Sequence, residues 1–313
     1  MANTAAGGRA NTAASGELAP PATGLRSDVM GTVISTERDG HVGVVWLDNE
    51  ARRNAMGMAF FDELPAAVNE LDGDSEVRAI VLAAKGPAFT VGLDLKSMTG
   101  ALTGDTSAGP GAESVTAATA APSQAAKRSR LLKNVKRLQA SISSVADTRV
   151  PVIAAVHGWC IGGGIDLITA ADIRVASSDA VFSVRETKVA IVADLGTLQR
   201  LPRIVGKGPA NELVFTGRDV SAVDAHHIGL VNSVWPDRDS TIEAALAMAH
   251  EIAGNSPLVV AGAKEVLRAS EGRPVADGLD FVAAWNAAFL ESNDLVEAMV
   301  AFMQKRPAEF SGS

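Results

Sequence analysis

The chain has 313 residues, of which 47% are hydrophobic and 20% charged, and its formal net charge at pH 7 is −8. This composition is that of a globular protein long enough to bury a sizeable core. The negative charge argues against nucleic acid or an anionic membrane as a partner, and no apolar run approaches the roughly 20 residues that span a bilayer. The single cysteine, Cys160, excludes an internal disulfide and a cysteine-based zinc site. It fits a reducing compartment, so we expect a cytoplasmic protein.

The chain divides into a tail, an alternating β/α core and a helical end. Residues 1–30 are rich in Ala, Gly, Thr and Pro without an apolar core, which predicts a disordered tail rather than a secretion signal. The core is predicted over residues 31–240, with a low-complexity insertion at 99–126 that we expect to form a mobile surface loop. Residues 241–313 are predicted to be a C-terminal helical region.

Apolar periodicity places the individual elements in chain order. A hairpin is predicted from strands at 32–36 and 42–47, joined by Asp39-Gly40. Further strands are predicted at 79–84, 152–156, 173–176, 180–184 and 231–234. Helices are predicted at 58–71, 127–145, 166–171, 198–205, 211–215, 222–227, 241–253, 257–269 and about 277–304.

One stretch organises the rest, namely the buried strand at 152–156 followed by Gly158 and the triplet Gly162-Gly163-Gly164 before a helix. Glycines between a strand and a helix allow a close backbone approach and leave N–H groups pointing outward. The helix N-terminus adds partial positive charge at the same place. Such a group of N–H donors suits an oxygen that becomes negative during a reaction. The alternative is a tight turn whose glycines serve packing only.

Three carboxyl residues lie in apolar surroundings, where burial shifts proton affinity. They are Asp166 after the glycines, Glu186 after the strand at 180–184, and Asp194 inside an apolar loop. Each has a structural alternative. Asp166 could satisfy N–H groups of a first helical turn, Glu186 could pair with Arg185 or Lys188, and Asp194 could cap the next helix. Together they suggest a site for proton transfer beside a carbonyl.

Other interpretations of these motifs fit less well. A dinucleotide fingerprint starting at Gly162 would need a glycine where Leu167 stands, no Gly-Lys-Ser/Thr follows, and no Gly-x-Ser-x-Gly elbow is present. His226-His227 lacks supporting ligands, so no metal site is predicted.

Five motifs in order make residues 32–306 resemble the crotonase, or enoyl-CoA hydratase/isomerase, superfamily. They are Arg53-Asn54-Ala55, Ala88-Phe-Thr-Val-Gly-Leu-Asp-Leu95, Pro151-Val-Ile-Ala-Ala-Val-His-Gly158 with the glycine triplet, Ala171-Asp-Ile-Arg174, and Gly196-Thr-Leu-Gln-Arg-Leu-Pro202. The resemblance implies an α/β fold, a crotonase-like spiral of ββα units with a C-terminal helical trimerisation region. It also implies a homotrimer or homohexamer that binds acyl-coenzyme A thioesters.

The resemblance also implies roles for particular residues. The backbone N–H groups of Leu93 and Gly163 would form the oxyanion hole for the thioester oxygen. Contacts to the substrate and its coenzyme A portion would come from Arg53, Ala55, Ala88, Val91, Asp94 and Gly162. No cofactor is implied beyond the coenzyme A carried by the substrate.

Within the superfamily, the carboxyl pattern is similar to that of Δ3,5-Δ2,4-dienoyl-CoA isomerases, which have Asp, Glu and Asp where this chain has Asp166, Glu186 and Asp194. Moving a conjugated diene requires removal of a proton at C2 and addition of one at C6, for which a second carboxyl farther along the acyl chain is useful. We therefore expect a dienoyl-CoA isomerase of fatty acid β-oxidation. The alternatives are an enoyl-CoA hydratase, another crotonase enzyme, or a noncatalytic acyl-CoA-binding protein.

Apolar side chains recur through the C-terminal helical region at spacings of three to four residues. They are Phe281, Trp285, Phe289, Leu290, Met299, Phe302 and Met303. We expect them to be buried against the body of the protein and a neighbouring subunit.

Overall fold

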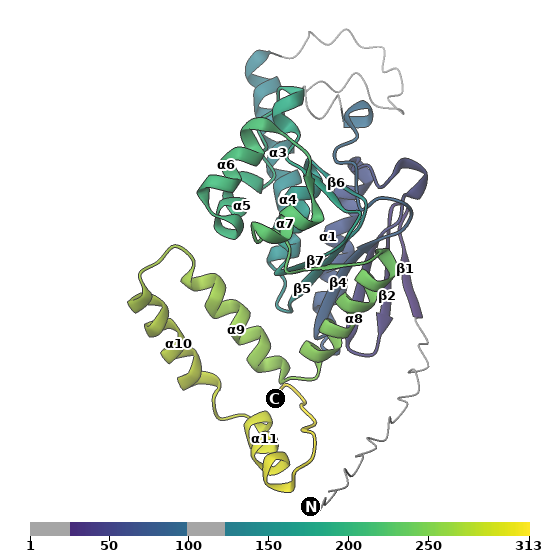
Figure 1. Ribbon diagram of the computed structural model, residues 1–313. Helices are drawn as coiled ribbons and strands as arrows, with labels where there is room; N and C mark the ends of the chain where they lie inside the picture. Colours follow the sequence, from purple (N-terminus) through teal and green to yellow (C-terminus); the bar gives the residue numbers. More distant parts are fainter. Residues whose placement is uncertain (1–25, 99–122) are drawn as a thin grey trace, which may run out of the picture.

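The computed structural model describes residues 26–98 and 123–313, and its centre is a seven-stranded mixed sheet (Figure 1). In spatial order the strands are β1 (Arg26–Met30), β2 (Ile34–Asp39), β3 (Val42–Leu47), β4 (Ala79–Ala84), β5 (Val152–Val156), β7 (Ile173–Ser177) and β10 (Ser233–Trp235). The pairs β1–β2 and β2–β3 are antiparallel, and the pairs from β3 to β10 are parallel. Every residue of β4 and β5 is buried, which explains their uninterrupted apolar sequences.

The predicted hairpin is confirmed, with Gly40 at a φ of 58° in its turn. The N-terminal boundary is a correction, because residues 26–30, assigned to the tail, form β1 and pair with β2. Their sequence, Arg-Ser-Asp-Val-Met, has no apolar alternation, so the neighbouring strand rather than local pattern determines the pairing. Residues 1–25 and 99–122, which include most of the predicted tail and insertion, lie outside the described residues.

Helices cover both faces of the sheet. On one face lie α1 (Met58–Gly73), continuous through Pro65, and α3 (Gln124–Ala146), which begins three residues before the predicted helix. Ser123, placed by prediction in the insertion, caps α3 by accepting from the Ala126 N–H. On the other face, α8 (Arg238–Ala253) packs small side chains onto the sheet through Ala245, Ala249 and Ala253. The division predicted at residue 240 therefore lies one helix too early, since α8 belongs to the core.

A second layer carries the glycine-marked turn. Its three-stranded sheet consists of β6 (Trp159–Ile161), β8 (Val181–Ser183) and β9 (Val220–Ser221). Around it lie α4 (Gly163–Ala170), η2 (Glu186–Val189), α5 (Thr197–Val205), α6 (Lys207–Thr216) and α7 (Ala222–His227). The prediction missed β6, because a strand of three residues has no readable period. It also began α4 at residue 166, whereas the helix starts at Gly163, so Gly163 and Gly164 form its first turn.

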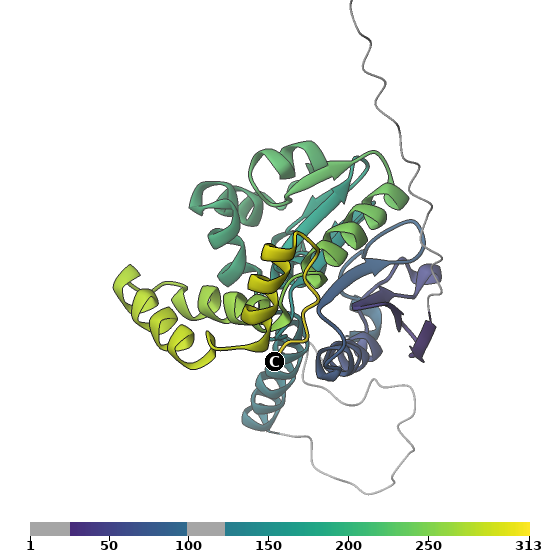
Figure 2. The ribbon, with the colours of Figure 1, turned by 90° about the horizontal axis from the view of Figure 1, so that it is seen from below.

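The C-terminal helices project from the body (Figures 1 and 2). They are α9 (Pro257–Ser270), α10 (Val275–Phe289) and α11 (Asn293–Gln304). The single helix predicted at 277–304 is wrong, because Ser292 caps a new helix by accepting from the Leu295 N–H. The predicted burial of this region against the body is also wrong within one chain. Phe302 is 85% exposed, and Phe289, Leu290, Met299 and Met303 are also exposed.

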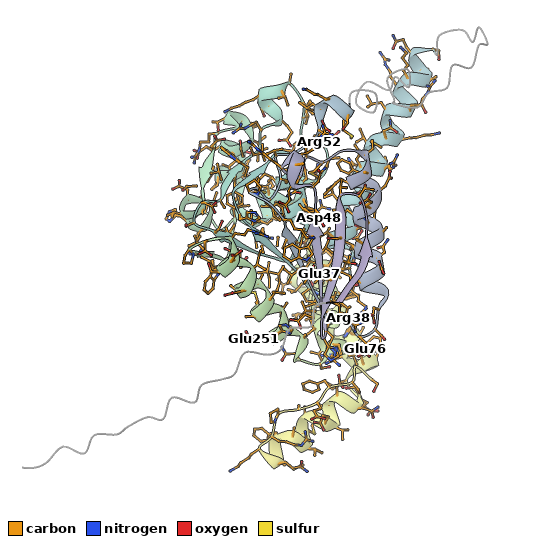
Figure 3. The ribbon with its side chains drawn as sticks, turned by 90° about the vertical axis from the view of Figure 1, so that its right-hand side faces the viewer. Glu37, Arg38, Asp48, Arg52, Glu76 and Glu251 are labelled. Carbon is orange, nitrogen blue, oxygen red and sulfur yellow. The ribbon has the colours of Figure 1, made fainter. Side chains whose placement is uncertain are left out.

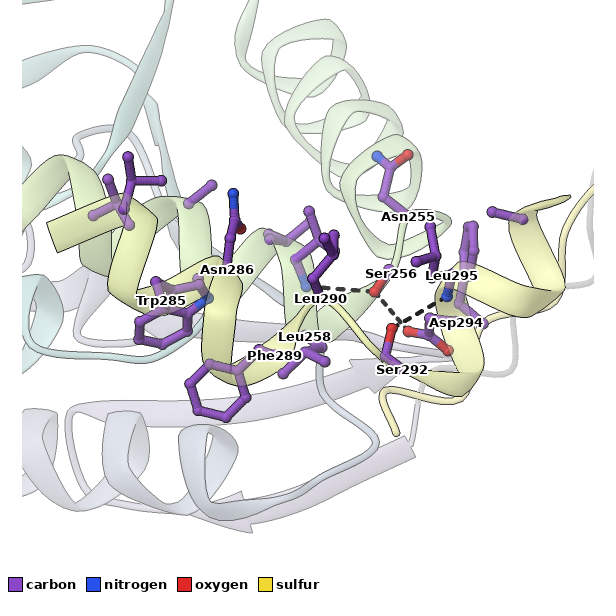
Figure 4. Close-up of a pocket in the computed structure, with 18 of the residues that line it drawn as sticks. Asn255, Ser256, Leu258, Trp285, Asn286, Phe289, Leu290, Ser292, Asp294 and Leu295 are labelled. Carbon is purple, nitrogen blue, oxygen red and sulfur yellow. Dashed lines mark hydrogen bonds between the residues drawn. The ribbon is translucent and has the colours of Figure 1, made fainter. Parts of the chain in front are cut away.

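A cavity of about 790 Å³ lies among α9, α10 and α11 (Figure 4). Beside it, buried Asp294 accepts a hydrogen bond of 2.6 Å from Ser256 Oγ and another of 2.8 Å from the Ser311 N–H. None of the candidate carboxyls lines this cavity. The cavity is formed by the packing of the C-terminal helices against one another and is separate from the candidate active site.

The candidate active-site residues lie toward the end of the hairpin where β3 leads into η1 (Glu50–Arg52). Figure 3 shows Asp48 and Arg52 toward this end, and Arg38, Glu76 and Glu251 toward the opposite end. Asp48 fixes the end of β3 by accepting from Ser35 Oγ at 2.8 Å and from Lys85 Nζ at 2.6 Å. In the part of the chain that the structure describes, no helix is long and apolar enough to cross a membrane.

Candidate active site

Two backbone turns, one after β4 and one after β5, lie against each other at the site. The Phe89 N–H donates to the His157 carbonyl and the Thr90 N–H to the Trp159 carbonyl, both at 2.9 Å. The Ile161 N–H returns a bond of 3.2 Å to the Thr90 carbonyl. These bonds connect the turn that carries Leu93 with the turn that carries Gly163, so the two predicted oxyanion-hole residues come together.

Gly92 makes this close approach possible. Its φ is 83°, and a Cβ there would lie 2.6 Å from the Ile161 carbonyl oxygen and 3.7 Å from the Gly163 nitrogen. Among residues 26–98 and 123–313, neither the Leu93 N–H nor the Gly163 N–H donates a hydrogen bond. Because Gly163 is also the first residue of α4, its N–H adds the positive end of a helix dipole. Two adjacent unused donors can bind one oxyanion.

Asn54 ties the loop after η1 to these turns, a role that the sequence analysis did not assign. It is 3% exposed and has a φ of 55°. Its Nδ2 donates to the carbonyls of Lys85 at 2.9 Å and Ala88 at 2.8 Å, while its Oδ1 accepts from the Asn49 N–H at 2.8 Å. The Asn54 carbonyl accepts from Thr90 Oγ1 at 2.6 Å. Although Asn54 lies in a recognised motif, its partners about 35 residues away become visible only in the fold.

The residues predicted to contact the substrate surround the same turns. The Val91 N–H donates to the Arg53 carbonyl at 3.2 Å, and Met56, next to Ala55, pairs with Leu93 in a β-bridge. The Gly162 N–H donates to the Ser183 carbonyl at 2.8 Å, and its Cα faces Glu186. Ala88 is buried under the Asn54 side chain.

Asp94, the remaining residue of the predicted contact set, is already engaged within the chain. It forms an ion pair of 2.7 Å with Arg52. Burial opposes ionisation of Asp94, but hydrogen bonds from Ser97 and the charge of Arg52 outweigh this effect and lower its pKa. Its carboxylate is therefore charged at neutral pH and serves to hold the loop that follows Leu93.

Asp166 lies in the first turn of α4, is 1% exposed, and accepts the Thr197 N–H at 2.6 Å. It therefore joins α4 to the start of α5 instead of satisfying its own helix. Burial raises its pKa to about 7, the Thr197 hydrogen bonds oppose this shift, and the charges of Glu186 and Asp194 add to it. The carboxyl is thus close to half-protonated at neutral pH.

Glu186 does not form the ion pair that was its structural alternative. It is 8% exposed, and its Oε2 has no hydrogen-bond partner within the described ranges 26–98 and 123–313. Arg185 pairs with Asp219 instead. Burial raises the pKa of Glu186, and the charge of Asp194 adds to this rise. A buried carboxyl with one unsatisfied oxygen leaves a hydrogen-bonding position open to a ligand.

Asp194 lies in the irregular loop between η2 and α5, and it is the exposed member of the three candidate carboxyls. It does not cap α5, because Gly196 occupies the capping position. Although the residue is exposed by surface area, the surrounding atoms desolvate its carboxylate enough to raise its pKa. The charges of Glu186 and Asp194 raise the pKa of Asp166, and that of Asp194 raises the pKa of Glu186, so the three predicted carboxyls lie near one another.

An apolar cavity of about 440 Å³ opens beside Glu186. Its other lining residues are Val184 and residues of η2, the following loop, α5 and α6, among them Ile191, Val192, Leu198 and Phe215. Such a cavity suits a hydrocarbon chain next to a carboxyl group. In the described ranges 26–98 and 123–313, no cluster of three or more His, Cys, Asp or Glu residues could hold a metal ion.

Comparison with known proteins agrees with this geometry. The sequence matches the Enoyl-CoA hydratase/isomerase family over residues 37–123 and 115–313. The chain belongs to this family. It is similar to an enoyl-CoA hydratase structure from Bacillus anthracis, with a TM-score of 0.78 and 29% identity over 90% of this chain and 100% of that one. The predicted crotonase-like α/β fold is therefore confirmed.

Two curated relatives are more similar in sequence. A mitochondrial Δ(3,5)-Δ(2,4)-dienoyl-CoA isomerase of Dictyostelium discoideum is 42% identical over 82% of this chain and 83% of its own. A peroxisomal Δ(3,5)-Δ(2,4)-dienoyl-CoA isomerase of Arabidopsis thaliana is 41% identical over 89% of this chain and 96% of its own.

The raised pKa of Asp166 predicts a pH-dependent stability. Between pH 4 and 7 the folded chain holds this proton and the unfolded chain does not, so the unfolding free energy falls as pH rises. A pKa of about 7 against the usual 3.8 corresponds to about 4 kcal/mol. Asp166→Asn removes this titration. The unfolding free energy of the variant minus that of wild type should therefore increase by about 4 kcal/mol from pH 4 to pH 8, as measured by chemical denaturation. A pH-independent difference would contradict the assignment.

Proposed function

We propose that this protein is an acyl-CoA isomerase that converts 3,5-dienoyl-CoA to 2,4-dienoyl-CoA in fatty acid β-oxidation. The observation that carries the proposal is the grouping of Asp166, Glu186 and Asp194 beside two unused backbone N–H donors. Relatives at 41% and 42% identity are named as enzymes of this reaction.

The Leu93 and Gly163 N–H groups would hold the thioester oxygen of the acyl-CoA. When C2 loses its proton, negative charge moves onto this oxygen, and the two donors stabilise it without reorganising. Arg53, Ala55, Ala88, Val91 and Gly162, which border these turns, would contact the substrate and its coenzyme A portion. Asp94 would contribute indirectly, by holding in place the loop that follows Leu93. We propose that the reaction uses no cofactor other than the coenzyme A of the substrate.

Glu186 would act as the base at C2. The electrons of the C2–H bond form a C1–C2 double bond, and the C1–O π electrons move onto the oxygen to give an enolate. When C6 takes a proton through the C5–C6 π electrons, the C3–C4 π electrons move to C4–C5, the C1–C2 π electrons move to C2–C3, and the oxygen electrons restore the thioester carbonyl. Asp194 would deliver that proton, because it lies farther along the apolar loop. Asp166, which has the most clearly raised pKa of the three, would orient or polarise through its link to Thr197.

We propose further that the chain assembles as a homotrimer or homohexamer through its C-terminal helices. Exposed apolar residues on α9, α10 and α11 support this, because monomeric proteins rarely expose so large an apolar area. They include Leu267, Val275, Leu279, Phe302 and Met303. A cytoplasmic location without nucleic acid or membrane as partner stays a prediction from the composition, and the two dienoyl-CoA isomerase relatives are named as mitochondrial and peroxisomal.

Substitution of the carboxyls tests the reaction. Asp194→Asn keeps the size of the side chain but cannot donate a carboxyl proton, so 3,5-dienoyl-CoA isomerisation should fall by about 10²–10⁴. Exchange of the C2 proton with solvent deuterium should persist, because Glu186 remains. Glu186→Gln should abolish both. If Asp194→Asn isomerises the 3,5-diene at the wild-type rate, Asp194 is not the acid at C6. A wild-type enzyme that hydrates 2-enoyl-CoA instead would favour the hydratase alternative.

The oxyanion hole is tested at Gly163. Because Gly163 is the first residue of α4, proline there removes the N–H without breaking an intrahelical bond. Gly163→Pro should lower kcat by about 10²–10³. Gly163→Ala is the matched control, since it adds a carbon near Met56 as proline does but retains the donor. Equal activity of folded Gly163→Pro and Gly163→Ala would exclude Gly163 as an oxyanion donor.

The assembly is tested by sedimentation at micromolar concentration, where we expect a trimer or a hexamer. Phe302→Asp with Met303→Asp places two charges on the exposed face of α11 and should shift the chain toward monomer. A wild-type monomer at this concentration would refute the proposed oligomer.

A further inference from the structure

The segment that carries Asp194 is held to the rest of the protein by few hydrogen bonds. It runs between Ala190, with a φ of 58°, and Gly196, with a φ of 131°, and has no regular structure. In the described parts of the chain, residues 192–195 form only two hydrogen bonds with other residues, and both are accepted by backbone carbonyls. Gln139 Nε2 donates to the Asp194 carbonyl at 2.7 Å, and Arg200 Nη1 donates to the Leu195 carbonyl at 3.4 Å.

Both bonds lead to α3. Gln139 and Ser143 are four residues apart, so they lie on the same face of the helix. Arg200 links Ser143 Oγ, at 2.9 Å, to the Leu195 carbonyl. The Arg200 guanidinium occupies the space beside Gly196, where an added Cβ would overlap Nη1 and lie 3.0 Å from Cζ. The segment is therefore fastened to a helix of 23 residues at two successive carbonyls.

The charge of Asp194 explains why this attachment is needed. Asp194 is exposed, and Asp166 and Glu186 lie close enough for its charge to raise their pKa values. An ionised Asp194 on a free loop would turn toward water, away from the two other carboxyls. Its own peptide has to be restrained for the carboxyl to stay inside the site.

We propose that Gln139 is a positioning residue for Asp194, assisted by the Arg200–Ser143 bridge. By holding the Asp194 carbonyl it keeps the second carboxyl at the distance from Glu186 that the C6 end of a diene requires. This inference rests on the proposed isomerase function. It assigns to α3 a part in deciding where the second proton is delivered, although Gln139 itself touches no substrate.

The test compares two reactions of the same enzyme. Gln139→Leu removes the donor and keeps a side chain of similar size with good helix propensity. Isomerisation of 3,5-dienoyl-CoA should fall about 10-fold to 100-fold, as expected when a reacting group is misplaced by about 1 Å. Exchange of the C2 proton with deuterium should stay within about twofold of wild type, because Glu186 is not attached to α3 in this way. Equal losses in both reactions, or no loss in either, would overturn the proposal.

Two comparisons separate positioning from a general loss of stability. Lys136→Leu makes the same kind of change on an exposed position of α3 and should leave both rates unchanged. In an Asp194→Asn background, Gln139→Leu should have no further effect on isomerisation, since the residue acts only through Asp194. Additive losses in this double variant would overturn the proposal.

Hydrogen exchange provides a readout that does not depend on the reaction. The backbone amides that flank the segment, Ile191 and Thr197, donate to the Glu186 carbonyl and to Asp166, and they should exchange faster in Gln139→Leu than in wild type, with the amides inside α4 unchanged. Unchanged exchange at Ile191 and Thr197 would refute the attachment even in an active isomerase. If wild type shows no isomerisation while the exchange difference is present, the proposed function fails and the attachment stands.

Discussion

The site depends on the contact between the turn after β4 and the turn after β5. Thr90 pairs with Cys160 across this contact, and Gly92 lies so close to Ile161 that no side chain fits. This approach brings the turns of Leu93 and Gly163 together, and neither N–H has an acceptor within residues 26–98 and 123–313. The buried strands β4 and β5 position the two turns, and Asn54 fixes them from a third segment. A loop without such a scaffold could not keep two backbone donors aligned.

Opposite these donors, the fold gathers carboxyl groups at a cost in stability. Asp166 and Glu186 are buried, the charges of Glu186 and Asp194 raise the pKa of Asp166, and the charge of Asp194 raises that of Glu186. Buried acids of this kind weaken the folded state at neutral pH, which argues that function rather than stability explains them. By contrast, Asp94 and Asp48 pair with Arg52 and Lys85, and these carboxyls hold loops in place.

In the C-terminal helices, polar contacts within the chain are made while apolar side chains stay exposed. Asp294 and Ser256 fasten α11 to α9, yet large apolar side chains such as Phe302 remain in contact with water. Local capping and hydrogen bonding therefore complete these helices, while burial of their apolar face requires another surface. This accounts for the exposure, within one chain, of side chains that were predicted to be buried against the body and a neighbouring subunit.

The sequence by itself determined most of the longer elements, because apolar periodicity and glycine positions are local signals. It located β4 and β5 to the residue, placed α7 correctly, and singled out Asp166, Glu186, Asp194, Leu93 and Gly163 as one site through ordered motifs. Only the tertiary structure decided what surrounds them. The bonds from Asn54 Nδ2 to Lys85 and Ala88, the link from Asp166 to Thr197 and the bond from Gln139 to Asp194 join residues 31 to 55 positions apart. No local pattern encodes such pairs, since they exist only when separate elements pack together.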